Sequence, residues 1–469
     1  MAAGTRIRPP DQASQLVLKP SPPGEAASQQ AEIGCTKPNE KAPHSFGIQT
    51  TAIDDWKYEE KKLILFASGL LDYIAMPASP ERTLKNSSAR VCVIGGGIIG
   101  SWTALHLAEA GAQTTLIEQF PLPHTRGSSH GLSRAFRFLG ELELGRLDYS
   151  LTRWQALQKA IGETLFVKTG LLNFGPPGDP DLERYMNVLM DGSRPVQWLE
   201  KETIANRYPM LNYSEDWGAA FDPNGGILVA HRCLNAVQSK FLELGGKIVT
   251  GCVKSFESQD ARGVAIEVRT HDSDTIDVES FDRAVVCAGP WTAKLVPSLE
   301  THLSSLLTPV TYWHDPTGSY SASSGFPIIF NARLTDIYGL PAYEYPGMVK
   351  MLYHGGPEAD PDRRDLASSK SYIKKVKRYV REHLPLLDHN KPAIRETCMY
   401  TMMSDGNPVI DRLDNNTVIG CGFSGSGFKH SPATGLMLAA LALGQDEAVP
   451  IDFGADRYDL GRLQPTLSK

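Results

Sequence analysis

The sequence predicts an α/β protein that combines a parallel sheet covered by helices with a second, mostly antiparallel sheet. The first observation is the order strand, glycines, helix, strand between residues 90 and 118, which is typical of a βαβ unit. The second is a renewed helix-then-strand pattern between residues 231 and 256. The third is a run of alternating apolar and aromatic residues from about 304 to 395, which favours antiparallel strands.

The βαβ unit begins with an apolar run at residues 91–94 and continues with Gly95, Gly97 and Gly100 in the spacing GxGxxG. The first glycine permits a tight turn, the second lets a pyrophosphate approach the backbone, and the third lets helix and strand pack closely. A second apolar strand, residues 114–117, ends at Glu118, whose carboxylate can accept hydrogen bonds from a ribose diol. This Rossmann-like order favours a cofactor with an ADP moiety, NAD or FAD, over a βαβ unit without a ligand.

Composition excludes several other classes of protein. The chain has 469 residues and a formal net charge of −6, which gives no basic surface for nucleic acid. Its 7 cysteines are odd in number and form no CxxC pair, which indicates a reducing compartment and no zinc site. The longest apolar run near the N-terminus, residues 63–76, contains Asp72 and is too short to span a bilayer. We therefore expect no metal and no membrane contact.

The N-terminal segment is expected to contribute little to the fold. Residues 1 to about 60 are rich in Pro, Ser, Gln and Ala, show little periodicity and are predicted to be disordered. The first twenty residues lack the apolar segment of a signal peptide. Residues 61–76 could form one amphipathic helix and residues 78–88 a linker, so folded sequence is expected to start near Ala89.

Helices and strands alternate along the remainder of the chain. Helices are predicted at residues 148–161, 182–199, 202–208, 231–244, 369–384 and 432–443. Strands are predicted at residues 165–174, 247–256, 282–287, 328–330, 336–340, 347–353 and 417–419. The 369–384 helix is basic, and we interpret its charges as a solvated face. The 432–443 helix is apolar on nearly every face, which predicts burial.

A second glycine-rich turn, residues 420–427, lies between a predicted strand and a predicted helix. Its glycines, Gly422, Gly425 and Gly427, could direct backbone N–H groups at the ligand of the first fingerprint. Lys429 follows as a candidate cation for an anionic substrate. From spacing alone, an ordinary surface lysine would be the commoner outcome.

Five separated motifs resemble those of one family. They are the GxGxxG fingerprint, SSHGxxRxxR at residues 128–137, AGPW at 288–291, CMYT at 398–401 and GFSGxGFK at 422–429. In this order they resemble the monomeric sarcosine oxidase family of the D-amino-acid-oxidase-like flavoproteins, which includes peroxisomal sarcosine and pipecolate oxidases. The resemblance extends over roughly residues 89–459.

The resemblance implies FAD as the cofactor. Its ADP half is expected on Gly95, Gly97, Gly100 and Glu118, with the adenine near the backbone of Val253. Further cofactor-binding residues are expected in the later motifs: Ser128, His130, Arg134, Gly422, Gly425, Gly427 and Lys429. Cys398 matches the cysteine that bonds covalently to the flavin 8α carbon, whereas an ordinary buried cysteine would be the default without the motif.

The resemblance also implies a substrate site. Arg137 and Lys429 match two cations that hold the substrate carboxylate, where a planar fork and a point charge fix one orientation. Tyr338, His354 and Tyr400 match residues of the substrate cavity, although His130 and His354 could equally be structural histidines. Arg134 matches an arginine close to the flavin ring. Lys350 matches a lysine opposite the substrate, where a cation stabilises charge developing on oxygen.

The implied activity is the oxidation of a secondary amino acid such as sarcosine or L-pipecolate. Hydride would pass from the amine α-carbon to flavin N5, and O2 would reoxidise the flavin and give hydrogen peroxide. The alternatives are an NAD-dependent dehydrogenase, a flavin-dependent amine dehydrogenase with a non-oxygen acceptor, and a flavin-binding protein without turnover. The resemblance implies a monomer in the peroxisome. The chain ends Leu467-Ser468-Lys469 rather than Ser-Lys-Leu, so the cytoplasm stays an alternative location.

Two further departures from the family concern the site itself. Residues 402–405 read MMSD after the CMYT motif, and Ser426 stands where many relatives have histidine. We expect a discontinuous FAD domain of residues 89–168, 232–303 and 404–454. A substrate domain would take residues 169–231 and 304–403, with residues 1–88 as an extension and 455–469 as a tail.

Overall fold

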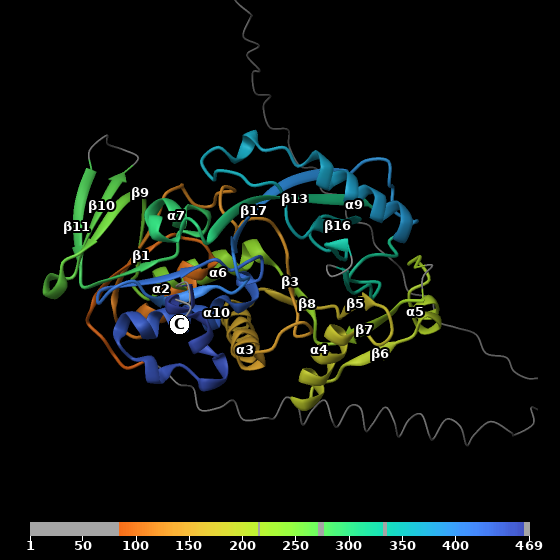
Figure 1. Cartoon of the computed structure of the whole chain (residues 1–469), viewed down its shortest axis with the longest axis horizontal. Coiled ribbons are helices and arrows are strands. Elements are labelled where there is room, and N and C mark those ends of the chain that lie inside the picture. Colours follow the sequence, from red (N-terminus) through yellow and green to blue (C-terminus); the bar gives the residue numbers. More distant parts are fainter. Residues whose placement is uncertain (1–83, 214–215, 271–275, 332–334, 464–469) are drawn as a thin grey trace, which may run out of the picture. The chain divides into compact units, whose positions relative to one another are not determined.

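The computed structural model describes residues 84–213, 216–270, 276–331 and 335–463. The helix expected at residues 61–76 and the disorder expected before it lie outside the described residues. None of the described helices has the length and apolar character that a membrane crossing requires. Figure 1 shows the described elements, coloured along the chain.

The predicted glycine fingerprint lies at the centre of one sheet, with the strand order β11-β10-β9-β2-β1-β12-β19-β18. In this order the strands are Ile276–Phe281, Val264–Thr270, Lys247–Ser258, Gln113–Glu118, Arg90–Ile94, Arg283–Val286, Thr417–Cys421 and Val409–Arg412. The strands from β9 to β19 are parallel. The apolar residues of β1 are buried, as expected for a parallel strand covered on both faces.

Two apolar helices pack against each other on this sheet, α2 (Ile98–Glu109) and α10 (Gly427–Leu443). Most of α10 is buried, as its sequence predicts. The two helices approach so closely that a Cβ added at Gly435 would lie 2.8 Å from Trp102 Cβ. The helix α6 (Ala230–Glu243) packs on α2, and α3 (Leu144–Ile161) packs on α10. Within this packing Trp102 lies beside Gly435, and His106 Nε2 contacts the Pro432 carbonyl oxygen at 3.0 Å.

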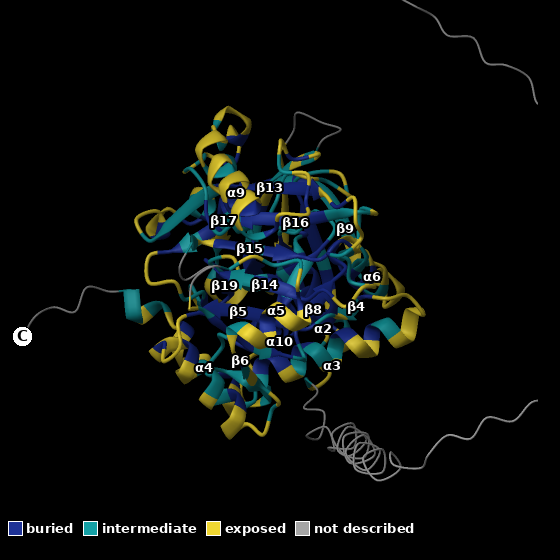
Figure 2. Ribbon diagram, turned by 90° about the vertical axis from the view of Figure 1, so that its right-hand side faces the viewer, coloured by how far each residue is buried: buried dark blue, intermediate teal, exposed yellow. Residues whose placement is uncertain are grey.

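A second sheet has the strand order β17-β13-β16-β15-β14-β5-β7-β6. In this order the strands are Ile394–Met403, Leu303–His314, Met348–Tyr353, Ile337–Leu340, Ile328–Asn331, Leu171–Gly175, Gly218–Asp222 and Gln197–Leu199. Its neighbours pair antiparallel, except for β14 with β5. This confirms the predicted second sheet, whose strands are buried beneath exposed outer helices (Figure 2).

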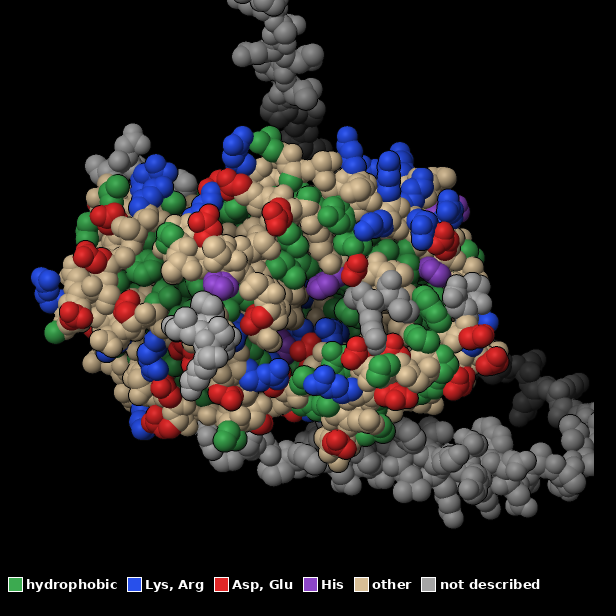
Figure 3. Space-filling view, viewed as in Figure 1, with side chains coloured by type: hydrophobic (Ala, Val, Ile, Leu, Met, Phe, Trp, Pro, Cys, Tyr) green, Lys and Arg blue, Asp and Glu red, His purple; other side chains and the backbone are tan. Residues whose placement is uncertain are grey.

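The basic helix α9 (Lys370–His383) packs on β13 and β16 through Val376, Tyr379 and Val380. Its lysines and arginines are exposed, and Figure 3 shows basic side chains gathered over this helix. The structure therefore confirms the prediction of a solvated basic face.

Short elements connect the two sheets. β3 (Arg134–Phe136), β8 (Gly226–Leu228) and β4 (Phe166–Lys168) form a small antiparallel sheet. The helices α4 (Pro180–Asp191) and α5 (Lys201–Arg207) lie in the segment that also contributes β5, β6 and β7. β3 matters for function because it contains Arg134 and leads directly into Arg137.

Some predicted boundaries are wrong. The helix expected at 182–199 ends at Asp191, because Gly192 and Ser193, which has φ 55°, stop it, and residues 197–199 form β6. The strand expected at 165–174 is divided into β4 and β5 at Gly170, which has φ 75°. The helix expected from residue 432 begins at Gly427 and contains Pro432. The Phe428 carbonyl, which a residue-432 N–H would contact in a regular helix, accepts the Ser431 hydroxyl at 2.8 Å instead.

The two sheets take their strands from alternating parts of the chain. The first sheet takes its strands from residues 90–118, 247–286 and 409–421, and the second from residues 171–222 and 303–403. The exact domain boundaries stay a prediction. The hairpin of β10 and β11, which extends the first sheet beyond β9, was not among the predicted strands.

Candidate active site

A cavity of about 970 Å³ extends from the glycine fingerprint to the second glycine-rich turn. Many of the predicted cofactor-binding residues line it: Gly95, Gly97, Glu118, Ser128, His130, Arg134, Val253, Cys398, Gly422, Gly425 and Gly427. Of the predicted substrate residues, Tyr400 lines it as well. The structure thus brings the separate motifs to one cavity.

The three fingerprint glycines have different surroundings. Gly95 has φ 107°, and a Cβ there would lie 2.3 Å from the Cys287 carbonyl oxygen. A Cβ at Gly100 would lie 2.0 Å from the Gly95 carbonyl oxygen, so this glycine serves packing rather than the cavity. The N-cap Gly97 is open apart from Ser129 Oγ at 3.2 Å from its added Cβ. A phosphate group could approach the backbone at Gly97, as the fingerprint requires.

The acid at the end of β2 is positioned by the turn. Glu118 is buried, and its carboxylate accepts the N–H groups of Gly96 at 2.8 Å and of Phe120 at 3.0 Å. His124 Nε2 lies 3.4 Å from the same side chain. Glu118 is therefore held at the wall of the same cavity that Gly97 lines.

Arg134 and Cys398 lie side by side on the cavity wall. The Arg134 guanidinium donates to the carbonyl oxygens of Ser128 at 2.8 Å and His130 at 2.6 Å, and it lies 3.6 Å from Cys398 Sγ. The His130 ring lies between two carbonyl oxygens, Gly127 at 2.7 Å and Thr397 at 2.8 Å. These contacts give His130 the geometry of a structural link between the 127–134 loop and β17.

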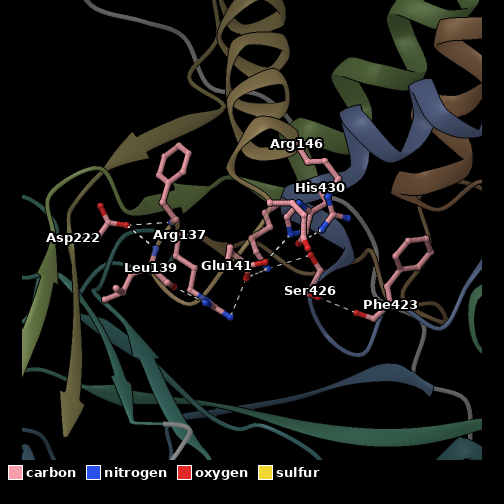
Figure 4. A network of polar contacts seen from close by, with 11 residues as sticks. Arg137, Leu139, Glu141, Arg146, Asp222, Phe423, Ser426 and His430 are labelled. Atoms are coloured by element: carbon pink, nitrogen blue, oxygen red, sulfur yellow. Dashed lines mark hydrogen bonds and ion pairs between the residues drawn. The ribbon is translucent and has the colours of Figure 1, made fainter. Parts of the chain in front are cut away.

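The two cations predicted to hold a carboxylate share a carboxylate of this chain. Glu141 Oε1 lies 3.3 Å from Arg137 Nη2 and 3.3 Å from Lys429 Nζ, and its other oxygen contacts His430 Nε2 at 3.1 Å (Figure 4). Arg137 Nη1 also donates to the Leu139 carbonyl. Lys429 lies in the first turn of α10 and is buried, so it is not the surface lysine that spacing alone would favour.

The charged groups in this cluster shift one another's pKa values. Burial lowers the pKa of Lys429 to about 8, although Glu141 opposes this effect. Burial would raise the pKa of Glu141, but Lys429 and Arg137 together hold it well below its ordinary value. Burial and Lys429 lower the pKa of His430 to about 3, so this imidazole is neutral at physiological pH. The cluster at pH 7 thus holds two cations and one carboxylate.

Three aromatic side chains adjoin the second glycine-rich turn. The hydroxyls of Tyr338 and Tyr400 lie 3.0 Å apart, and the His354 ring lies 5.4 Å from the Tyr400 ring. A Cβ at Gly425 would meet His354 Cε1 at 2.9 Å, so the glycine lets the turn approach the imidazole. Burial, followed by the charge of Arg137, lowers the pKa of His354. The three side chains thus form an aromatic cluster beside the turn, and the charges of Arg137 and Lys429 act on its imidazole.

Lys350 is buried on β16, next to the small sheet. Its Nζ donates to the carbonyl oxygen and the hydroxyl of Ser133, at 3.0 Å and 3.1 Å. Ser133 directly precedes Arg134, so the lysine approaches the residues of the cavity from the side of β3.

Several residues of the site belong to no recognisable motif in the sequence. Glu141 follows the arginine-containing motif without belonging to it, and Ser133 is an unassigned position inside that motif. Glu344 and Glu396, which surround Lys350, lie in strand and turn segments with no distinctive pattern. The density of charge in the sequence GELE at 140–143, directly after the motif, is the one hint that could have indicated Glu141.

The donor set fits a dinucleotide cofactor. An open glycine at a helix N-terminus, an acid at the end of the next strand and a long cavity that continues to Cys398 are together the features that such a cofactor needs. The second glycine-rich turn and Tyr400 line the same cavity. The residues of this chain therefore fit FAD.

Comparisons with known proteins agree with this geometry. A family model described as FAD dependent oxidoreductase matches residues 90–441. Peroxisomal sarcosine oxidase of Mus musculus is 36% identical over 80% of this chain and 96% of the relative. For the enzyme of Homo sapiens the identity is 37% over 75% of this chain and 91% of the relative. Monomeric sarcosine oxidase of Bacillus sp. (strain B-0618) is 30% identical over 75% and 92%.

Solved structures share the fold at lower identity. L-proline dehydrogenase from P. horikoshii has a TM-score of 0.67 and 21% identity, covering 80% of this chain and 97% of that chain. Glycine oxidase from Geobacillus kaustophilus has a TM-score of 0.64 and 18% identity, covering 80% and 100%. Both the predicted resemblance and the predicted α/β architecture with a Rossmann-like cofactor domain are confirmed. The chain belongs to the FAD dependent oxidoreductase family.

Proposed function

We propose that this protein oxidises a secondary amino acid of the sarcosine or L-pipecolate type and transfers the electrons to oxygen. The observation that carries the proposal is a pair of cations, the partly buried Arg137 and the buried Lys429, that share the Glu141 carboxylate. Two cations placed around one carboxylate form a site suited to the carboxylate of an amino acid. The relatives named sarcosine oxidase support the same substrate class.

The substrate carboxylate would replace Glu141 between the two cations. Arg137 would supply paired donors and Lys429 a point charge, which together restrict the orientation of the bound acid. Tyr338, His354 and Tyr400 would surround the remainder of the substrate. Because the surroundings are apolar and contain two cations, they favour binding of the amine in its neutral form.

The cofactor would lie along the cavity, with its ADP half against Gly95, Gly97 and Glu118. Bound FAD would accept a hydride from the substrate α-carbon and pass the electrons to O2, giving hydrogen peroxide. Cys398 Sγ lines the cavity, and we propose it as the site of covalent attachment. Arg134 would place positive charge next to the attached ring, since it lies 3.6 Å from this sulfur.

Lys350 would act in the oxygen reaction. Its buried ammonium would stabilise negative charge that develops on oxygen and is absent from the ground state. We further propose a monomer, in line with the monomeric relative, and a peroxisomal location, in line with the peroxisomal relatives.

A peroxide assay over a panel of amines tests the proposal. Sarcosine, L-pipecolate and L-proline carry a carboxylate, whereas dimethylamine and piperidine offer the same kinds of C–N bond without one. We expect peroxide only with the acids, and a strongly raised KM for the preferred acid in Lys429→Met. Equal turnover of acids and plain amines would refute the carboxylate site. Flavin reduction by the acids without peroxide would instead identify a dehydrogenase.

A further inference from the structure

Glu344 is a buried carboxylate without a hydrogen-bond donor. It lies in the connection between β15 and β16, and both of its carboxylate oxygens are buried with no hydrogen-bond partner among the described residues. The neighbouring acid Glu396 differs, because it accepts the hydroxyls of Tyr345 at 2.9 Å and Tyr312 at 3.3 Å. An ionised carboxylate buried without partners is costly, so Glu344 requires a nearby positive charge or a bound water.

Lys350 lacks an acceptor among the described residues for one of its N–H donors. A protonated lysine has three N–H donors, and Lys350 donates to two acceptors, both on Ser133. Its Nζ lies 5.7 Å from the centre of the Tyr312 ring, and Tyr312 is its partner in the register of β13 and β16. The Tyr312 ring in turn meets the Tyr345 ring edge-on at 4.9 Å, one residue after Glu344. The spare donor and the unpartnered carboxylate thus belong to one cluster.

The two charges influence each other without direct contact. Among the carboxylates around Lys350, Glu344 is the one that opposes the effect of burial most. Because no donor reaches its oxygens, the lysine does not bond to it directly. A water molecule between the ammonium and the carboxylate would satisfy the third lysine donor and one carboxylate oxygen at once.

We propose that Glu344 is the water-bridged counter-ion of Lys350, a positioning residue that keeps the lysine ammonium charged for the oxygen reaction. This inference rests on the proposed role of Lys350. Without a counter-ion, a lysine as deeply buried as this one would lose its proton close to neutral pH, and with it the ability to stabilise charge on oxygen.

The charges around Lys350 explain why one carboxylate decides whether the lysine stays protonated. Burial, together with the charge of Arg134 on β3, lowers the pKa of Lys350 to about 8. Glu344 in the β15–β16 connection and Glu396 on β17 act in the opposite direction. Cys398 on β17 does so only as a free thiolate, which the proposed bond to the flavin removes. Tyr312 on β13 stays a neutral donor, since burial and the charges of Glu344 and Glu396 raise its pKa. The Glu396 carboxylate already accepts hydrogen bonds from two phenols, whereas the Glu344 carboxylate accepts none from the described residues.

The direct test is the ionisation of Lys350 in the holoenzyme. Lysine ¹³Cε resonances are titrated by NMR, and the resonance that is missing in Lys350→Met identifies the residue. We expect Glu344→Gln, which keeps the shape of the side chain, to lower the pKa of Lys350 by about one unit or more. The matched variant Glu396→Gln should lower it less, and Glu344→Asp should lie close to the wild type.

The oxygen reaction gives the second readout, because its rate in stopped flow should fall with rising pH at a lower midpoint in Glu344→Gln. An unchanged Lys350 pKa in Glu344→Gln, or a larger shift in Glu396→Gln, overturns the inference. If Glu344→Gln does not fold, a wild-type pKa in Glu344→Asp together with a shifted one in Glu344→Ala supports it, and equal values in both overturn it. If Lys350→Met reoxidises as fast as the wild type, the proposed role of Lys350 fails, whatever the NMR titration shows.

Discussion

Lys429 gives the substrate site a pH dependence of its own. Burial lowers its pKa to about 8, so the side chain is a cation below this pH and neutral above it. The KM for a carboxylate substrate should therefore rise as the pH increases through about 8, because one of the two cations is lost. Lys429→Arg should abolish this rise, since a guanidinium keeps its proton throughout the accessible range.

The measurement is the pH profile of KM for the preferred acid in both proteins, between pH 6 and 10. The exposed Lys374 on α9 offers a matched control, since Lys374→Arg exchanges the same groups outside the cavity. An identical rise of KM in Lys429→Arg would show that another group titrates.

Glu141 should have a measurable structural role in the absence of substrate. Glu141→Gln removes the anion from between the partly buried Arg137 and the buried Lys429 and leaves both cations without it. We expect the free energy of unfolding to fall by roughly 3 kcal/mol, the usual cost of breaking a buried pair by removing one partner. Added acetate should restore much of this loss in the variant and little in the wild type, since it can take the vacated position.

Thermal unfolding with and without acetate is the measurement. A variant that is as stable as the wild type, or one that acetate does not affect, would contradict the internal-carboxylate interpretation.

Among single residues, the sequence identified the cations that belong to motifs but not the carboxylates that neutralise their charge. Arg137 and Lys429 were identifiable because the motifs that contain them have fixed spacing. Their partner Glu141 was not, because its contact with His430 joins positions 289 residues apart and depends on where α10 begins. Glu344 was not identifiable either, because its importance follows from the missing hydrogen-bond partners of its carboxylate among the described residues, which only the folded structure shows.

Among the elements, one segment after β16 fastens the loop that forms the cavity wall. Arg364 is buried, and its guanidinium donates to the carbonyl oxygens of Thr125 and Arg126, both at 2.7 Å. Arg126 itself forms an ion pair with Asp365 at 2.7 Å. The 124–134 loop, which carries Ser128 and His130, is thereby tied to a segment more than two hundred positions later.

Removal of this tie should loosen the loop. Arg364→Ala leaves two carbonyl oxygens without their donors, and we expect it to lower the free energy of unfolding by about 1.5–3 kcal/mol. Limited proteolysis should also cut the 124–134 loop faster. The neighbouring Arg363 is exposed, so Arg363→Ala is the matched control and should behave as the wild type in both assays.

The secondary structure that was predictable is the part with strong periodicity. The parallel strands and the buried C-terminal helix follow from continuous apolar runs, which tertiary context reinforces. The boundaries failed where one residue overrides the pattern: Gly170 divides a predicted strand, Gly192 and Ser193 shorten a predicted helix, and Pro432 does not mark the beginning of α10.

For the whole molecule, the proposed covalent bond decides whether cofactor binding and stability are linked by mass action. A non-covalent ligand at a hundredfold excess over its Kd stabilises a protein by about 2.7 kcal/mol. If FAD is attached through Cys398, the melting temperature of the wild type should not depend on added FAD. Cys398→Ser should melt at a temperature that rises with FAD concentration and should release its flavin on acid precipitation.

Differential scanning calorimetry over a series of FAD concentrations is the measurement, with Cys252→Ser as the matched control. Cys252 also lines the cavity but lies on β9, away from Arg134. A melting temperature of the wild type that rises with FAD as in Cys398→Ser would argue against the bond.

The architecture as a whole was more predictable than its details. The GxGxxG turn alone allowed NAD as well as FAD, and the motifs at 398–401 and 422–429 narrowed the choice before any contact was known. The internal charge balance of the site was not predictable, since it depends on side chains from β3, β16, β17 and α10 that meet only in the folded protein.

The packing of α2 against α10 has a consequence for folding during synthesis on the ribosome. His106 Nε2 contacts the Pro432 carbonyl at 3.0 Å across a separation of 326 residues. At a synthesis rate of about 5–20 residues per second, α10 emerges roughly 15 to 65 seconds after α2. During that interval the apolar side chains of α2 have no helix to cover that face, and the glycine turn has no opposite wall. We expect the nascent chain to bind chaperones in this interval, and flavin to be acquired only after release.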